Sequence, residues 1–194
     1  MYTVIGATRS RTMRVLWALE EMGLPYEHQP ALPRSDDILK HNALGKIPAL
    51  LDGAAVLTDS MAIVTYLADK HGQLTAPAGT LERARQDALT FWLIDEFDAI
   101  LWAAAKHSFI LPEDARVPDV KDTLKDEFVK SADTLTAQLD GPFLIGNELT
   151  IPDILACHCI NWSIGAKFPR INDTLFAYAK DLRERPAFQA AAAR

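Results

Sequence analysis

Hydroxyl and guanidinium side chains alternate near the start of the chain, in Thr8-Arg9-Ser10-Arg11-Thr12, and Arg14 follows. The segment lies between an expected strand and an expected helix, where the positive end of a helix dipole begins. A hydroxyl that donates to a sulfur atom, beside cations and a helix N-terminus, lowers the pKa of a thiol from its usual value of about 8.5. This arrangement could hold a bound thiol as thiolate. Taken alone, however, the segment also fits a helix N-cap flanked by solvated arginines, and that interpretation is the commoner one.

A second candidate is the segment Gly45-Lys46-Ile47-Pro48-Ala49-Leu50. Pro48 opens an expected strand, where the missing N–H does little harm. If the Ile47–Pro48 peptide bond is cis, the backbone N–H and C=O of Ile47 turn outward and can pair with an extended peptide. A trans bond, which is the commoner form, leaves a plain strand start. Lys46 could take a carboxylate or simply be solvated.

The third candidate, Thr58-Asp59-Ser60, directly precedes an apolar helical pattern. Ser and Asp at such a position satisfy backbone N–H groups that the helix leaves open, so simple capping is one interpretation. In the other, Asp59 accepts a ligand ammonium group while Ser60 and the N–H groups hold a carboxylate.

Two further clusters favour structural interpretations. Asp95 and Asp98 are three residues apart in a helical pattern and share a face, which we expect to be solvated. In Cys157-His158-Cys159, helical neighbours two apart point to nearly opposite sides, so the cysteines predict a buried helix and no metal site.

The elements that must position these residues fall into two groups. The first 72 residues alternate between strand and helix periods in the order β-α-β-α-β-β-α, which is the order of a thioredoxin-like sheet. A break follows at 73–80, and beyond it only helical patterns appear. We therefore predict an α/β thioredoxin-like domain at 1–75 and an all-α domain at 81–194. The expected strands are 2–7, 26–29, 47–51 and 54–57, with a turn at Asp52-Gly53; the expected helices are 12–22, 36–41, 59–71, 81–107, 119–139, 151–164, 172–185 and 186–193.

Composition narrows the function classes. The chain has 194 residues, is 49% hydrophobic and 24% charged, and is therefore expected to fold as a soluble globular protein. Its 20 basic and 26 acidic residues give a net charge of −6, which argues against a nucleic-acid partner. Two cysteines make no disulfide framework, and no signal peptide or membrane span is visible. We expect a cytoplasmic location and no membrane partner.

Together these segments resemble the cytosolic glutathione S-transferase family, in a bacterial-type form, over essentially the whole chain. The matching stretches are 10–17, 23–27, 45–50, 58–63, 143–154 and 185–188. Within 143–154, Thr150 and Asp153 have the spacing of a helix capping box, whose role is in folding. No Tyr or Cys occurs in the loop 6–12, so the resemblance is to serine-like classes, and the tyrosine and cysteine types are disfavoured.

The resemblance implies a glutathione site. In it, Pro48 is cis, Ile47 pairs with the cysteinyl backbone, Asp59 and Ser60 hold the γ-glutamyl end, and Lys46 holds the glycyl carboxylate. Ser10 would donate to the sulfur. Arg11 is assigned to the glutathione site as well.

Two departures from the family pattern affect these assignments. The usual acidic residue before Ser60 is Glu, and here it is the shorter Asp59. The catalytic position is also ambiguous, because an ungapped alignment places Arg9 at or beside the serine position. We choose Ser10 as the catalytic residue, with Thr12, Thr8 and the backbone of Arg11 as rivals.

The activity implied is conjugation of glutathione, held as thiolate, to a small hydrophobic electrophile, without a metal. The alternatives are glutathione-dependent reduction of peroxides or disulfides, and a non-catalytic binding or assembly protein on the same fold. Trp102, Phe109 and Ile110 could line the acceptor pocket or pack in the core. Because the chain stops soon after Phe188, we expect an open acceptor pocket. The family also implies a homodimer, in which Asp95 or Asp98 could reach the γ-glutamyl site of the partner.

Overall fold

A four-stranded mixed sheet forms the first part of the computed structural model, which describes residues 1–139 and 141–194. Its strand order is β2-β1-β3-β4, with β1 parallel to β2 and antiparallel to β3, and with β3 antiparallel to β4. This sheet and the helical region that follows confirm the predicted fold class. The strands are β1 (Tyr2–Ile5), β2 (Tyr26–Gln29), β3 (Ala49–Asp52) and β4 (Ala55–Thr58).

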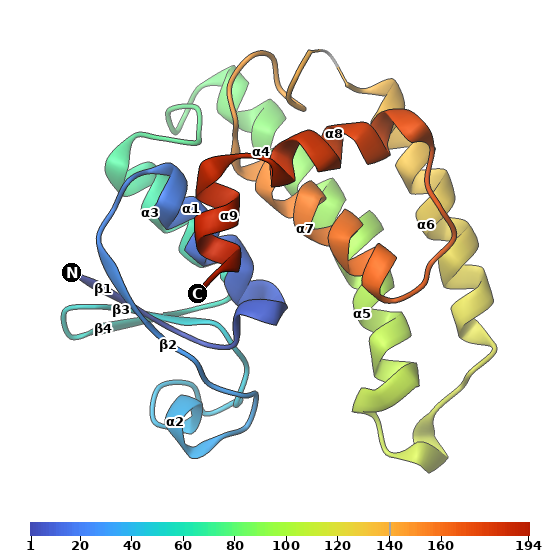
Figure 1. The fold of residues 1–194 in the computed structure, drawn as a ribbon, viewed down its shortest axis with the longest axis horizontal. Coiled ribbons are helices and arrows are strands. Elements are labelled where there is room, and N and C mark those ends of the chain that lie inside the picture. The colour runs from blue at the N-terminus through green and yellow to red at the C-terminus, as the bar shows by residue number, and fades with distance from the viewer. Residues whose placement is uncertain (140) are drawn as a thin grey trace. The chain divides into compact units, whose positions relative to one another are not determined.

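Helices cover both faces of the sheet. Figure 1 shows α1 (Met13–Glu21) and α3 (Ser60–His71) on one side and α2 (Asp36–Leu39) on the other. Ile5 packs in one cluster with Ile38 of α2, whereas its neighbour Val4, fully buried, points to the opposite face because side chains alternate along a strand. Helix α1 is buried along most of its length and contacts α3.

The hairpin turn differs from the prediction by one residue. Asp52 pairs with Ala55 at the end of β3, so the turn consists of Gly53 and Ala54, with Gly53 at φ 60°. The reason is a tertiary contact: the Asp52 carboxylate accepts hydrogen bonds from Tyr66 Oη, at 2.6 Å, and from Lys70 Nζ, both on α3. The ion pair and the tyrosine hold the pKa of Asp52 below its usual value.

The remaining elements of the described chain are all helices, and the predicted helix 81–107 is divided. Wider π-type turns replace the α-helix within it, so the residues no longer repeat at a single period. None of the described helices is both long and apolar enough to cross a membrane. The elements are α4 (Leu81–Leu93), η2 (Ile94–Ala99), α5 (Ile100–Ala105), η3 (Lys106–Ile110), η4 (Glu113–Ala115), α6 (Val120–Ala137), α7 (Ile151–Gly165), α8 (Asp173–Arg183) and α9 (Pro186–Ala192).

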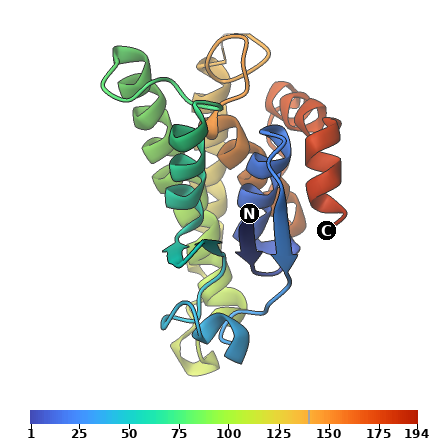
Figure 2. The same ribbon diagram turned by 90° about the vertical axis from the view of Figure 1, so that its left-hand side faces the viewer.

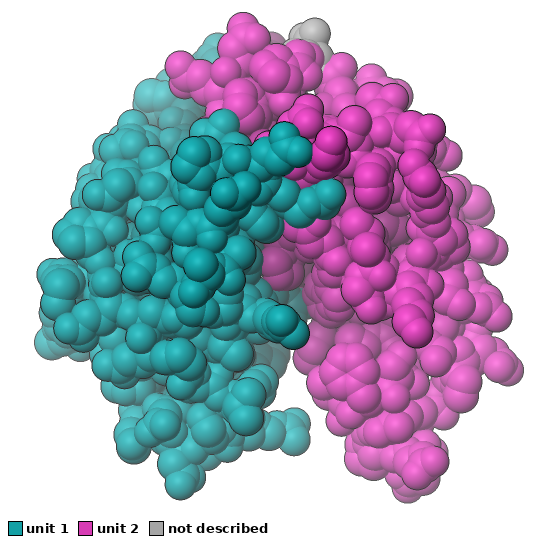
Figure 3. Space-filling view, in the orientation of Figure 1, with its two compact units in different colours: residues 1–83, 183–194 teal, residues 84–182 magenta. Residues whose placement is uncertain are grey.

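Two compact units make up the chain, coloured separately in Figure 3. Unit 1 contains Met1–Arg83 and Arg183–Arg194, and unit 2 contains Ala84–Leu182. Unit 1 is completed by α9, which packs against α1 (Figure 2). Trp17 and Phe188 meet edge to face at 5.1 Å, and Arg185 donates two hydrogen bonds, of 2.6 and 2.8 Å, to the carboxylate of Glu21.

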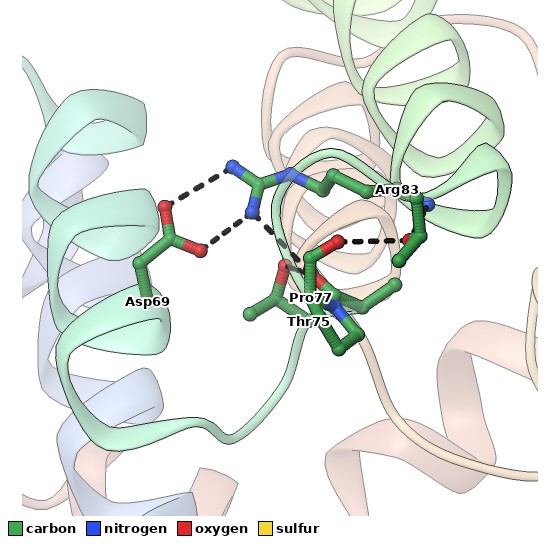
Figure 4. A network of polar contacts seen from close by, with 6 residues as sticks. Asp69, Thr75, Pro77 and Arg83 are labelled. Carbon is green, nitrogen blue, oxygen red and sulfur yellow. Dashed lines mark hydrogen bonds and ion pairs between the residues drawn. The ribbon is translucent and has the colours of Figure 1, made fainter.

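The segment between α3 and α4 is an ordered turn (Figure 4). Arg83 donates to both carboxylate oxygens of Asp69, at 2.5 and 3.2 Å, and its guanidinium also reaches the carbonyl of Ala76. Thr80 Oγ1 accepts the backbone N–H of Arg83 at 3.1 Å and donates to the carbonyl of Pro77 at 2.8 Å. The predicted break at 73–80 is therefore tied to the end of α3 by an arginine that is largely buried.

In unit 2, the predicted capping box at the start of α7 is confirmed. Asp153 is fully buried and accepts hydrogen bonds from the backbone N–H and hydroxyl of Thr150, from the N–H of Leu144 and from the hydroxyl of Tyr178, at 2.7–2.9 Å. Burial raises the pKa of Asp153, and these donors offset part of that effect. One carboxylate thus joins α7, α8 and the segment before α7.

We expect Asp153→Ala to lower the free energy of unfolding by about 3 kcal/mol, because a cap is lost and buried donors are left without an acceptor. Tyr178→Phe removes a single hydrogen bond and should cost about 1 kcal/mol. Urea denaturation of the two variants measures the difference. Asp181→Ala, at an exposed position on α8, is the control; a loss at Asp153 no larger than at Asp181 would contradict the assignment.

Candidate functional site

Gly6 lies where three segments of unit 1 converge. Its φ is +147°, and a Cβ at this position would lie 2.3 Å from Thr12 Oγ1 and 3.0 Å from the Cβ of Ile47. Its N–H donates to the carbonyl of Gln29, and its carbonyl lies 2.7 Å from His28 Nε2. The absence of a side chain at Gly6 therefore lets Thr8–Thr12, here called the hydroxyl loop, approach the segment before β3. The sequence assigned no role to His28.

The three loop hydroxyls have different partners. Ser10 Oγ accepts the backbone N–H of Thr12 at 3.0 Å and lies within donating distance of the Ala7 carbonyl, at 2.6 Å, and of Thr12 Oγ1, at 2.9 Å. Ser10 is half-buried and has non-helical dihedral angles within the short segment η1 (Thr8–Thr12), whereas Thr12 is fully buried. Ser10 thus caps the first turn that leads into α1, as one interpretation of the sequence proposed.

Thr8 connects the loop to the other end of unit 1. Its hydroxyl donates to the carbonyl of Arg194 at 2.8 Å. The Arg194 guanidinium donates to Glu20, which also accepts from Tyr26 Oη at 2.6 Å. Burial and the hydrogen bond to Glu20 raise the pKa of Tyr26 to about 12. Sequence reasoning missed this contact, since nothing local relates residues so far apart in the chain.

The arginines near the loop do not share one environment. Arg9 is exposed and Arg11 is half-buried, but Arg14 is buried, and its Nη1 donates to the hydroxyl of Ser60 at 3.3 Å. Arg14 therefore joins α1 to the first residue of α3. The sequence suggested that the arginines beside this loop are solvated, but Arg14 is buried and is not.

The Ile47–Pro48 peptide bond is cis, as the family resemblance implied. The Ile47 side chain packs against the cluster that contains Ile5, and among the described residues no turn or loop hydrogen bond between backbone groups involves Ile47. Asn42, which the sequence analysis did not single out, donates to the carbonyl of Lys46 at 2.9 Å and accepts the N–H of Leu44. An Asn at the start of a turn was the available signal. The Lys46 side chain is exposed.

Asp59 begins α3 in an unusual conformation, with φ 71°. Its Oδ1 accepts the backbone N–H groups of Met61, at 2.9 Å, and Ala62, at 3.0 Å, which confirms that it caps the helix. Ser60 is 2% exposed, whereas Asp59 is exposed to solvent. Arg14, Ser60 and Asp59 therefore form one chain of neighbours from α1 to the start of α3.

The acidic pair of unit 2 departs from the expectation. Asp95 is exposed, but Asp98 is 9% exposed, so the prediction of a common solvated face is wrong for Asp98. Both lie in η2, where the wider turn rotates residues three apart away from a shared face. Between them Glu96, which the sequence reasoning left without a role, accepts a 2.8 Å hydrogen bond from Ser131.

Cys157 and Cys159 form no disulfide and are fully buried; their burial was predicted. Within residues 1–139 and 141–194, no group of three or more His, Cys, Asp or Glu side chains could hold a metal ion. Phe109 and Ile110 are 66% and 40% exposed, so they do not belong to the core, the alternative that the sequence left open.

Comparisons with known proteins agree with this fold. Residues 9–70 match the model of the glutathione S-transferase N-terminal domain. A glutathione S-transferase of Triticum aestivum is 29% identical over 92% of this chain and 86% of its own length. The crystal structure of a glutathione transferase from Methylococcus capsulatus is 25% identical, with a TM-score of 0.85 over 100% of this chain and 98% of that one. A theta-class enzyme of Xanthomonas axonopodis, solved with glutathione bound, is 25% identical, with a TM-score of 0.79 over 100% and 97%. These likenesses support an assignment of the chain to the cytosolic glutathione S-transferase family.

Variants of Asp59 distinguish the stability contributed by its capping hydrogen bonds from the cost of its backbone conformation at positive φ. Asp59→Ala should lower the free energy of unfolding by about 1–2 kcal/mol, because the cap is lost and a Cβ remains at positive φ. Asp59→Gly should cost only a few tenths of a kcal/mol, since Gly tolerates this φ. Asp59→Asn keeps the acceptor and should stay near the parent. Thermal unfolding ranks the three; an Ala variant as stable as the Asn variant would refute the capping role.

Proposed function

We propose that the chain is a glutathione transferase that binds glutathione in a domain at 1–75 and an electrophile beside a helical domain at 81–194. The observation that carries the proposal is the convergence at Gly6, which brings the hydroxyl loop and Ile47 together at the N-terminus of α1. A thiol bound there lies near hydroxyl donors and the positive end of a helix dipole, and both favour thiolate. The family likeness supports the same conclusion at the level of the reaction class.

The ligand's charges match the groups available in unit 1. Glutathione is an extended tripeptide with two carboxylates, one ammonium group and a thiol. The Ile47 backbone would pair with the cysteinyl residue, and the Lys46 ammonium with the glycyl carboxylate. Asp59 commits Oδ1 to its cap, which leaves Oδ2 for the ligand ammonium. Because Asp59 already accepts the N–H groups of Met61 and Ala62, the hydroxyl and backbone N–H of Ser60 would receive the γ-glutamyl carboxylate.

Among the loop hydroxyls, Ser10 is the best donor to the sulfur. A hydroxyl has one donor and two acceptor positions, so Ser10 can keep the Thr12 N–H as a cap while its proton turns from the Ala7 carbonyl to a sulfur. Thr12 is fully buried and can then donate back to Ser10, which supports the serine as donor. Thr8 is already committed to Arg194. The backbone N–H of Arg11 would be the second donor.

The reaction follows from a stabilised thiolate. The thiolate sulfur attacks the electrophilic carbon and forms a C–S bond. In a substitution the bond from that carbon to the leaving group breaks and the group departs with the electron pair; in an addition the π bond of the acceptor breaks and its electron pair moves onto the acceptor, which then takes up a proton. The protein contributes a lowered thiol pKa and the placement of the two reactants. We further propose a cytoplasmic homodimer. If an acidic side chain of η2 reaches the partner's glutathione, the exposed Asp95 suits that role better than the buried Asp98.

Ser10→Ala should raise the pKa of bound glutathione toward the ordinary value of about 8.5 and lower the conjugation rate about a hundredfold. The ultraviolet absorbance of the thiolate, followed against pH, reports the first effect, and turnover of a chloronitroaromatic reports the second. Ser10→Thr keeps the hydroxyl and should restore both. An unchanged thiolate in Ser10→Ala would show that Ser10 is the wrong residue, and a loss in Thr12→Val alone would assign the role to Thr12.

Lys46→Gln should weaken glutathione binding about fivefold, since an exposed ion pair is lost. Lys40→Gln is the matched control: Lys40 is also exposed in the same region, and it pairs with Asp37 at 2.9 Å. Calorimetric titration of both variants makes the comparison. Equal affinities would remove Lys46 from the site, and no glutathione binding by the parent would favour a non-catalytic protein on this fold.

A further inference from the structure

Arg194 contacts unit 1 at two places that lie on either side of α1 in the sequence. Its guanidinium donates two hydrogen bonds to Oε1 of Glu20, in the last turn of α1, from Nε at 3.2 Å and from Nη2 at 2.7 Å. Its backbone carbonyl accepts a 2.8 Å hydrogen bond from the hydroxyl of Thr8, the first residue of the hydroxyl loop. One residue therefore connects the end of α1 to the loop that precedes this helix.

Tyr26 helps to fix the side chain of Arg194. The guanidinium lies over the Tyr26 ring, 5.0 Å from its centroid, in a cation–π contact. The Tyr26 hydroxyl donates to the same oxygen of Glu20 at 2.6 Å. The side chain of Glu20 is 19% exposed, against 47% for that of Arg194. An exposed ion pair contributes little by itself, but here the ring and the largely buried carboxylate together define where the guanidinium lies.

The hydroxyl loop needs contacts outside itself to fix its place in unit 1. Ser10 has φ −147° and ψ −169°, so the chain is extended there and no regular helix determines its path. The hydrogen bonds of Ser10 with Ala7 and Thr12 join residues in or next to the loop, and they set its shape but not its position. The bond from Thr8 to Arg194 instead joins the loop to a residue 186 positions later in the chain.

We propose that Arg194 is a positioning residue for the transfer reaction: by accepting the hydrogen bond of Thr8, it holds the hydroxyl loop in the conformation from which Ser10 donates to the sulfur of glutathione. The inference rests on the proposed function, in which Ser10 is that donor. Thr8 is then an anchor of the loop and not a rival donor. A group that acts on a reacting atom must be held within about 0.5 Å of its productive position, so a loop that loses an anchor loses rate before it loses ligand affinity.

Four variants of the full chain test the contact by turnover of a chloronitroaromatic. Thr8→Val removes the donor at nearly constant volume and should lower kcat about fivefold, the effect of one lost hydrogen bond, while the affinity for glutathione stays within about twofold. Thr8→Ser keeps the hydroxyl and should restore kcat. Arg194→Met removes the guanidinium that fixes the carbonyl and should lower kcat by a smaller factor. Gln189→Ala, at an exposed position of α9, is the control and should leave kcat unchanged.

Two further measurements distinguish a positioning role from a general loss of stability. The pKa of bound glutathione, followed through the absorbance of its thiolate, should rise in Thr8→Val and in Arg194→Met, although circular dichroism shows both variants to be folded. The variant with both changes should be no slower than Thr8→Val alone, because both changes break the same contact. Additive losses of rate, or a lowered kcat with an unchanged thiol pKa, would overturn the proposal.

Amide hydrogen exchange separates failure of this inference from failure of the proposed function, because it needs no ligand. The N–H of Thr12 donates to Ser10 Oγ at 3.0 Å, and its exchange reports the order of the loop. Without glutathione, this exchange should be faster in Thr8→Val and Arg194→Met than in the parent and in Gln189→Ala. Unchanged exchange would refute the positioning role. A parent that binds no glutathione would contradict the proposed function, and the exchange of Thr12 would still decide whether Arg194 orders the loop.

Discussion

Each α-helix leaves its first backbone N–H groups without partners inside the helix, and the supply of acceptors to them shapes both units. At α7 the acceptor is Asp153, which is fully buried and whose carboxylate oxygens accept hydrogen bonds from groups of the protein. At α3 the acceptor is Asp59, which is exposed and uses one oxygen. In the turn that leads into α1 it is Ser10, which accepts the N–H of Thr12 and whose proton can still be redirected. The same capping requirement therefore serves folding where the cap is buried, and in the proposed function it also serves ligand binding where the cap meets solvent.

Close approach of backbone segments is the second condition for the proposed site. Thr12 and Ile47 both lie next to the space that a Cβ at residue 6 would occupy. The proposed site therefore requires glycine at this position. Helix α1 carries the loop into this position because its central residues are fully buried. Its two ends are also tied down, by Arg14 to Ser60 and by Glu21 to Arg185. The hydroxyl loop is thus carried by a helix that packing holds in place.

Local sequence signals predicted most of the elements and less of the site. The strand 26–29 matches β2, and Gly72 ends α3 in the left-handed conformation that favours glycine. Signals of this kind fail where a residue distant in the sequence determines the local structure. Asp52 is an example, because its hydrogen bond with Tyr66 of α3 holds it at the end of β3. The burial of Asp98 followed from a change of helical period that residue types do not encode. For Ser10, the family pattern indicated a residue, but the direction of its hydroxyl depends on Ala7 and Thr12, which only coordinates supply.

The return of α9 to unit 1 has a consequence for the order of events during synthesis. Residues 1–83 are translated before residues 84–182, yet the helix that covers Trp17 and the arginine that neutralises Glu21 belong to residues 183–194, which are translated after both. Unit 2 emerges in between and has its whole sequence available earlier. Although N-terminal domains commonly fold first, here the N-terminal unit is the one that finishes last. Until α9 is translated, the nascent chain exposes the surface of α1 that α9 covers in the folded unit.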